Sequence, residues 1–158
     1  MIKTNAMRIL DKMKIDYNIM TYDKKDGKID GISVANKIGR DDKYVYKTIV
    51  TQGISKNIYV LVIPVRYEIE FKKVSKITNE KRVEMLDVND LQKYTGYIRG
   101  GCSPIGMSKQ YKTFIDKSAL EMKTIIISGG KIGLQIEINA KSLKDVVDGK
   151  FEDLTLNI

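Results

Sequence analysis

The architecture follows from two consecutive runs, Val45-Tyr46-Lys47-Thr48-Ile49-Val50-Thr51 and Ile58-Tyr59-Val60-Leu61-Val62-Ile63-Pro64-Val65. Both are rich in the β-branched and aromatic residues that favour strands. The segment between them, Gln52-Gly53-Ile54-Ser55-Lys56-Asn57, contains residues typical of turns. The sequence therefore predicts a β-hairpin here.

Short helices and strands alternate on both sides of this hairpin. Upstream, the pattern predicts a helix from the N-cap Thr4 to about Lys14, a strand over 17–22 and a small helix capped by Ser33. Such interleaving favours an α+β fold, a mixed, curled, barrel-like sheet flanked by short helices. The elements expected downstream are helices over 68–77, 87–94 (closed by Gly96) and 139–147, a helical turn over 117–121, strands over 83–86 and 112–115, and a second hairpin of 124–128 and 134–138.

Length and composition indicate one soluble domain. The 158 residues have no linker-like or repetitive tract, so we expect a single domain over 1–158. No apolar run approaches the roughly 20 residues of a membrane span, and the first residues lack a signal-like apolar segment. One cysteine favours a cytoplasmic setting, and a net charge of +8 is compatible with a polyanionic partner.

A loop of unusual composition runs from Thr95 to Gly106, with the sequence TGYIRGGCSPIG. Its glycines let another molecule approach the backbone closely, and Pro104 stiffens its exit. Such a loop exposes backbone amides and is typical of a recognition or oxyanion-binding site. The chain contains no histidine, which excludes Ser-His-Asp triads, Cys-His dyads and histidine-ligated metals.

Three ordered blocks resemble one known family. They are Lys47-Thr48-Ile49-Val50, the 95–106 loop, and Ser128-Gly129-Gly130-Lys131-Ile132-Gly133-Leu134-Gln135-Ile136-Glu137. Together they are similar to the YbaK/EbsC family of Cys-tRNA(Pro) deacylases, relatives of the editing domain of bacterial prolyl-tRNA synthetases. The resemblance covers nearly the whole chain, from Thr4-Asn5-Ala6 to the final helix.

The resemblance implies a function and a set of partners. It implies hydrolysis, in trans, of the ester that joins a wrong amino acid, cysteine above all, to the acceptor end of tRNA(Pro), in company with prolyl-tRNA synthetase. The substrate's own thiol would attack the ester carbonyl, so no protein nucleophile and no cofactor or metal are expected. A pocket selective for alanine, and a non-catalytic module that binds tRNA or the synthetase, remain alternatives.

The resemblance also implies which residues form the site. Lys47 would act as a cationic donor, and the amides of Gly100 and Gly101 would stabilise the oxyanion. The remaining members would shape the substrate pocket; they are Tyr22, Ser103, Pro104 and Gln135.

Several of these residues have ordinary structural explanations. A strand lysine usually faces solvent, paired glycines often form a tight turn, and Ser103 can cap its own loop. Cys102 resembles a nucleophile, but nothing in the sequence supplies its base, so we interpret it as a wall residue. The segment 129–133 lacks the spacing of a phosphate-binding loop and is predicted to be a hairpin turn.

Overall fold

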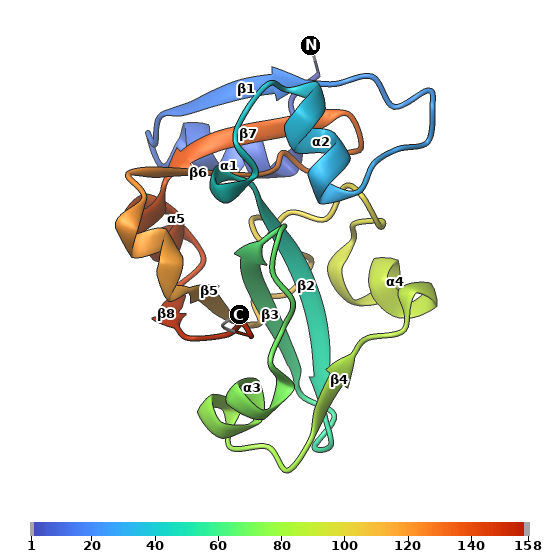
Figure 1. Ribbon diagram of the computed structural model, residues 1–158, viewed down its shortest axis with the longest axis vertical. Helices are drawn as coiled ribbons and strands as arrows, with labels where there is room; N and C mark the ends of the chain where they lie inside the picture. Colours follow the sequence, from blue (N-terminus) through green and yellow to red (C-terminus); the bar gives the residue numbers. More distant parts are fainter. Residues whose placement is uncertain (1, 157–158) are drawn as a thin grey trace.

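The computed structural model describes residues 2–156 and shows a mixed α+β fold with two β-sheets (Figure 1). The smaller sheet has the strand order β1-β7-β6, and the larger has the order β4-β2-β3-β5-β8. The strands are β1 (Tyr17–Thr21), β2 (Tyr46–Gly53), β3 (Ile58–Pro64), β4 (Val83–Met85), β5 (Lys112–Asp116), β6 (Thr124–Ser128), β7 (Leu134–Asn139) and β8 (Lys150–Glu152).

Both predicted hairpins are confirmed. Strands β2 and β3 pair antiparallel with Tyr46 opposite Pro64, and β6 and β7 pair antiparallel with Ser128 opposite Gln135. The larger sheet is mixed because β5 pairs parallel to β3, and β8 pairs parallel to β5. The short strand β8 was not predicted, because it depends on pairing with β5, which lies more than thirty residues away in the sequence.

The two sheets meet beside the start of β2. A single parallel bridge, Val45 to Ile126, links them, and no closed barrel forms among residues 2–156. The mixed α+β class is therefore confirmed, whereas the barrel-like curl stays a prediction. Buried residues of the smaller sheet, such as Ile127 and Ile136, share one core with Leu10 and Leu143 from two helices. This core fixes the smaller sheet against the rest of the molecule.

Helices α1 and α5 begin where their capping residues predict. Helix α1 (Asn5–Lys12) is capped by Thr4, whose side chain accepts a hydrogen bond from the Met7 amide. Helix α5 (Ala140–Val146) is capped by Asn139 in the same way. Helix α4 (Leu91–Thr95) ends at Gly96, which has a left-handed conformation, and a short 3₁₀ turn over Val88–Asp90 precedes it. Two further 3₁₀ turns cover Asp42–Tyr44 and Lys117–Glu121, and the second of these was expected.

Two helix starts differ from the prediction. Helix α2 (Gly31–Lys37) is capped by Asp30, which accepts hydrogen bonds from the Ser33 amide and hydroxyl, so Ser33 lies inside the helix. Helix α3 (Phe71–Thr78) begins after Glu70 rather than at Glu68, because Ile69 pairs with Thr155 in an isolated β-bridge. Within residues 2–156, no helix combines the length and the apolar character that crossing a membrane requires.

An ion pair joins the segment after helix α2 to the smaller sheet. The Arg40 guanidinium donates to both carboxylate oxygens of Glu137 on β7, at 2.8 and 2.9 Å, and Glu137 also accepts from the Thr124 hydroxyl at 2.7 Å. The Arg40 hydrogen bonds hold the pKa of Glu137 below its ordinary value. The pair thus helps to hold the segment after α2, which leads into β2, beside β7.

Candidate functional site

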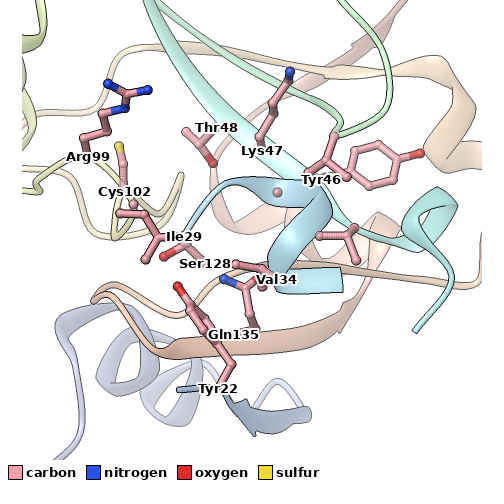
Figure 2. Close-up of a pocket in the computed structure, with 14 residues that line it drawn as sticks. Tyr22, Ile29, Val34, Tyr46, Lys47, Thr48, Arg99, Cys102, Ser128 and Gln135 are labelled. Atoms are coloured by element: carbon pink, nitrogen blue, oxygen red, sulfur yellow. The ribbon is translucent and has the colours of Figure 1, made fainter. Parts of the chain in front are cut away.

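A pocket of about 210 Å³ lies where β2, α2 and the loop over 95–106 meet the smaller sheet (Figure 2). We call this loop the glycine loop. It draws its walls from segments far apart in the sequence. The lining residues are Tyr22, Ile29, Gly31, Val34, Val45, Tyr46, Lys47, Thr48, Val65, Arg99, Gly100, Cys102, Ser128 and Gln135.

Lys47 and Arg99 supply the positive charge of this pocket. Both side chains lie on the same side of it, across from Tyr22 and Gln135 (Figure 2). Lys47 is half-buried, and neither cation forms an ion pair with any residue of the 2–156 range. An unpaired ammonium beside a pocket is available for a negatively charged or electron-rich group of a ligand.

Two hydroxyls in the pocket have no hydrogen-bond partner within the described part of the chain. They are the phenol of Tyr22, a residue only 9% exposed, and the hydroxyl of Thr48. A buried polar group without a partner costs about 1–3 kcal/mol. A ligand that hydrogen-bonds to these hydroxyls would recover that cost, so the pocket favours a small molecule or group with polar atoms.

Gln135 lies on β7 between Met20 of β1 and Ser128 of β6. Its side chain is buried and faces the pocket, and its amide nitrogen makes one long contact of 3.4 Å to the Leu134 carbonyl. The Ser128 hydroxyl accepts from the Gly130 amide at 3.2 Å. This side of the pocket is therefore polar but uncharged.

The glycine loop reaches the pocket through Gly100, whereas Gly101 serves the loop itself. Gly100 has φ +87°, and its amide donates no hydrogen bond to another residue of the described range. The Gly101 amide already donates to the Ile98 carbonyl at 3.0 Å. A Cβ atom at Gly101 would come within 2.9 Å of the Lys131 Cα. In the structure Gly101 is therefore a residue of close backbone packing, and its role as an oxyanion donor stays a prediction.

Ser103 and Pro104 lie behind the pocket wall rather than on it. Both are buried, and neither lines the pocket. The Ser103 hydroxyl accepts from the Ile105 amide at 3.2 Å, which is the local capping role that a serine in such a loop often has. These two residues support the loop that carries Gly100 and Cys102, and their contact with the substrate stays a prediction.

Helix α1 fixes the glycine loop from outside. The Asn5 side chain donates to the Gly106 carbonyl at 3.0 Å, and the Thr4 hydroxyl donates to the Gly129 carbonyl at 2.6 Å. The Tyr97 phenol donates to the Ile105 carbonyl at 2.5 Å. Thr4 and Asn5 thus tie the start of helix α1 to the turn at Gly129 and to the end of the glycine loop, although both residues lie outside the pocket.

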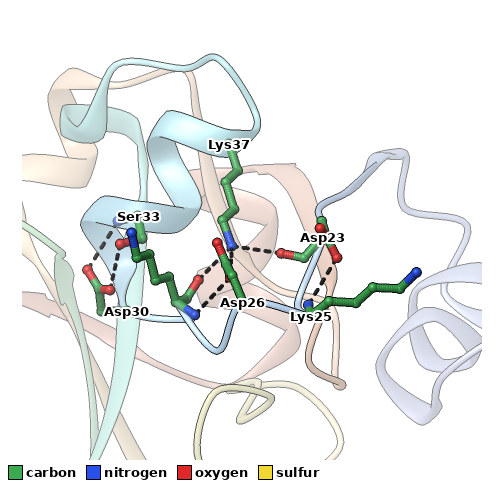
Figure 3. A network of polar contacts seen from close by, with 7 residues as sticks. Asp23, Lys25, Asp26, Asp30, Ser33 and Lys37 are labelled. Atoms are coloured by element: carbon green, nitrogen blue, oxygen red, sulfur yellow. Dashed lines mark hydrogen bonds and ion pairs between the residues drawn. The ribbon is translucent and has the colours of Figure 1, made fainter.

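The loop before α2 lines another side of the pocket through Ile29, and Figure 3 shows the polar contacts that hold this loop. The Lys37 ammonium donates to the carbonyls of Asp23 and Lys28 and to the Asp26 carboxylate, at 2.7, 2.9 and 2.7 Å. It also lies 5.9 Å from the centre of the Tyr22 ring. Lys37 thus holds the loop that places Ile29 in the pocket wall.

Sequence reasoning missed several pocket residues. Thr48 and Ser128 lie in the recognised blocks, but neither was singled out as a site residue. Ile29 was missed because an isolated isoleucine in a polar loop carries no signal of its own. Gly100 has φ +87°, and a Cβ atom there would come within 2.6 Å of Ile29 Cδ1, so a larger residue would be strained and would displace the Ile29 side chain.

Cys102 lines the pocket as an unactivated thiol. Burial raises its pKa to about 12, so the sulfur is protonated at neutral pH and is a poor nucleophile. This agrees with its interpretation as a wall residue. Within residues 2–156, no group of three or more cysteine, aspartate and glutamate side chains has the arrangement of a metal site.

Replacing Cys102 with alanine is expected to change any deacylation rate by no more than about tenfold, the scale of a modest change in a pocket wall. Loss of a true nucleophile costs roughly 10⁶-fold in the best-studied enzymes. Single-turnover rates of Cys102→Ala and wild type, measured at equal protein concentration, separate the two cases. A loss of several orders of magnitude, in a variant that melts like wild type, would contradict the wall interpretation.

Known proteins share both the sequence and the fold. The sequence profile of the family described as "Aminoacyl-tRNA editing domain" matches residues 31–146. The chain is 40% identical over 153 residues to an Enterococcus faecalis protein named "Putative Cys-tRNA(Pro)/Cys-tRNA(Cys) deacylase EbsC". That alignment covers 97% of this chain and 93% of the relative.

Two solved structures are similar in fold. One is described as "a putative trans-editing enzyme for prolyl tRNA synthetase" and has a TM-score of 0.84 at 14% identity, over 99% of this chain and 100% of that chain. The other, described as a hypothetical protein, has a TM-score of 0.88 at 16% identity, over 97% of this chain and 100% of that chain. At these identities the likeness concerns the fold alone.

Proposed function

The chain belongs to the aminoacyl-tRNA editing family that includes the YbaK and EbsC deacylases, and from this premise we propose that it hydrolyses mischarged aminoacyl-tRNA(Pro), with Cys-tRNA(Pro) as its main substrate. The observation that carries the proposal is the pocket itself. Lys47, the two unpartnered hydroxyls and the Gly100 backbone all face one small cavity, which suits a small acyl group on an RNA terminus.

The proposed chemistry needs no nucleophile from the protein. The thiol of the esterified cysteine attacks its own carbonyl carbon, so that an S–C bond forms while the C–O bond to the ribose breaks. The thiol proton passes to the departing ribose oxygen, and water then opens the resulting thiolactone to free cysteine. Intramolecular attack gains a large effective molarity, so the protein mainly has to hold the acyl group in the reactive conformation.

The pocket residues fit this division of labour. The Lys47 ammonium would stabilise the negative charge that develops during ester cleavage or hold the phosphate next to the terminal adenosine. The free Gly100 amide would donate to the carbonyl oxygen in the role expected of the glycine pair. The Tyr22 and Thr48 hydroxyls would orient the substrate through polar contacts such as its α-amino group.

The choice of amino acid depends on small energies. A pocket discriminates a side chain from one that differs by a single group by about 1–3 kcal/mol, so alanine is the strongest competitor. Thiol assistance would add discrimination that the pocket walls cannot supply, because alanine and serine lack the sulfur. The uncharged Gln135 leaves the pocket without a fixed negative charge near the acyl group.

The deciding experiment compares Cys-, Ala- and Ser-tRNA(Pro) as substrates of the purified protein. Ester loss is followed against the buffer rate, and we expect the cysteinyl ester to be lost fastest. Preferential loss of the alanyl ester would favour the alanine-specific alternative. Tight binding of tRNA(Pro) with no loss of any ester would favour the non-catalytic module.

The cellular setting follows from the same proposal. The chain would work as a single editing domain in the cytoplasm, where charged tRNA is produced, and would meet its substrate as it leaves prolyl-tRNA synthetase. Pull-down of prolyl-tRNA synthetase by the tagged protein, with and without tRNA(Pro), would test this association.

A further inference from the structure

A second hollow lies at the other end of the central hairpin from the pocket. It encloses about 460 Å³, within the range of ligand-binding clefts. We call it the Tyr–Lys groove; its lining residues are Lys56, Asn57, Ile58, Tyr59, Tyr94, Lys109, Gln110, Tyr111 and Lys112.

The charged residues that line the Tyr–Lys groove are all positively charged. Three of its nine lining residues are lysines and none is acidic. All three lysines are exposed, and none forms an ion pair with another residue between positions 2 and 156. Lys93, also exposed, lies 5.5 Å from the centre of the neighbouring Tyr94 ring. Lysines left free in this way favour a polyanion through the release of its counterions.

Aromatic rings lie between these cations. Tyr94 and Tyr111 are half-buried and line the groove, and Lys109 lies 6.0 Å from the centre of the Tyr111 ring. The Tyr111 phenol donates to the Tyr94 carbonyl at 2.6 Å, which fixes the two residues relative to each other. Fixed rings between cations are the usual means of binding single-stranded nucleic acid, since bases stack on the rings and phosphates meet the cations.

The groove and the pocket share two structural elements. Tyr94 precedes the glycine loop, whose Arg99, Gly100 and Cys102 line the pocket. On the hairpin, the pair Lys47–Ile63 lies four residue pairs from Thr51–Tyr59, or about 13 Å along the strands. The turn between β2 and β3, which carries Lys56, lies at the end remote from the smaller sheet (Figure 1). An RNA end held in the pocket is thus only a few nucleotides away from the groove.

We propose that the Tyr–Lys groove is an RNA-binding site that holds the acceptor arm of the tRNA while its charged end lies in the pocket. The proposal rests on the proposed function for the position of the charged end. Phosphates contact the groove lysines, and one base near the acceptor terminus stacks on Tyr94. The substrate is then held at two points, which makes intact tRNA a better substrate than a short aminoacylated end.

The first test measures the binding of uncharged tRNA(Pro) by fluorescence anisotropy at several salt concentrations. The Lys109→Glu/Lys112→Glu variant should bind at least about tenfold more weakly than wild type near 0.1 M salt, and the slope of log Kd against log salt should fall by about 1.5, for two lost phosphate contacts. Lys123→Glu/Lys141→Glu, at two exposed lysines of a different hollow, carries the same charge change and should bind like wild type.

The second test separates stacking from charge. Tyr94→Leu should weaken binding by about tenfold, on the scale of one lost stacked base, whereas Tyr94→Phe keeps the ring and should restore it. Circular dichroism and thermal melting check the fold of each variant. If Tyr94→Leu does not fold, the charge-reversed pair decides alone, because its two side chains are exposed.

Other outcomes overturn the proposal. If Lys109→Glu/Lys112→Glu binds tRNA(Pro) as tightly as wild type, the groove is not an RNA-binding site. If a folded Tyr94→Leu keeps its affinity, the stacking of a base on Tyr94, which the proposal requires, does not occur. Unchanged tRNA binding with lost binding of prolyl-tRNA synthetase would make the groove a protein-binding surface. Because the tRNA in these tests carries no amino acid, the results do not depend on catalysis. A wild-type protein without deacylase activity would refute the proposed function but not the proposed RNA-binding groove.

Discussion

Methylation of the substrate thiol is expected to slow deacylation of cysteinyl-tRNA(Pro) by at least about 10³-fold, because the attacking group is then lost. Well-oriented intramolecular attack reaches effective molarities of roughly 10⁵–10⁸ M, far above what external water provides. The protein offers no replacement: it has no histidine, and burial raises the pKa of its only thiol, that of Cys102, to about 12. The ester of S-methylcysteinyl-tRNA(Pro) should therefore be hydrolysed at close to its rate in buffer alone.

The measurement is a single-turnover comparison of cysteinyl- and S-methylcysteinyl-tRNA(Pro), with the buffer hydrolysis of each ester subtracted. Competition between S-methylcysteinyl-tRNA(Pro) and cysteinyl-tRNA(Pro) for binding checks that the added methyl group still fits the pocket of about 210 Å³. If S-methylcysteinyl-tRNA(Pro) binds and is hydrolysed as fast as cysteinyl-tRNA(Pro), water is the nucleophile, and the proposed attack by the substrate thiol is wrong.

The fold was largely predictable because its elements carry local signals. Thr4 and Asn139 cap helices where their side chains reach the next amides, and runs of β-branched and apolar residues on either side of turn residues identify both hairpins. The errors lie where long-range contacts decide. Ile69 pairs with Thr155 and delays helix α3, and β8 exists only because β5 offers it an edge. Neither partner can be identified from the residues of the element itself.

The site was predictable in part, for a related reason. Lys47, Tyr22, Gly100 and Gln135 do line one pocket, although only their sequence neighbourhood, matched to a family, singled them out. That match cannot separate a residue that faces the cavity from one that supports it. Gly101 lies next to Gly100, yet its amide is engaged with Ile98, a distinction that depends on the turn and not on the composition of the loop.

The closure of the pocket was beyond sequence reasoning for a physical reason. Lys37 holds the loop of Ile29 through the carbonyls of Asp23 and Lys28, and backbone carbonyls leave no trace in a sequence. The meeting of Ile29 with Gly100 joins positions more than seventy residues apart. Such contacts become visible only when the fold is known.

Removal of the ammonium at position 47 is the second change with a large expected effect. Lys47→Ala should lower kcat/KM for Cys-tRNA(Pro) by about 10²–10³-fold, the usual cost of losing one donor that stabilises transition-state charge. Arg99 stands on the same side of the pocket but is exposed at its rim, so its charge is screened by water and should not compensate.

Two further variants serve as controls for Lys47→Ala. Lys81→Ala removes an exposed lysine that lies in a bend outside the pocket, and it should act like wild type, which controls for the loss of one positive charge in tRNA binding. Lys47→Arg keeps the charge but spreads it over a larger planar group, so it should recover binding more than rate. A rise in KM alone in Lys47→Ala would place the ammonium on a phosphate, whereas a fall in kcat would place it on the developing oxyanion. Full activity of Lys47→Ala would remove the lysine from the mechanism, and the Gly100 amide and the Tyr22 and Thr48 hydroxyls would then have to account for catalysis without it.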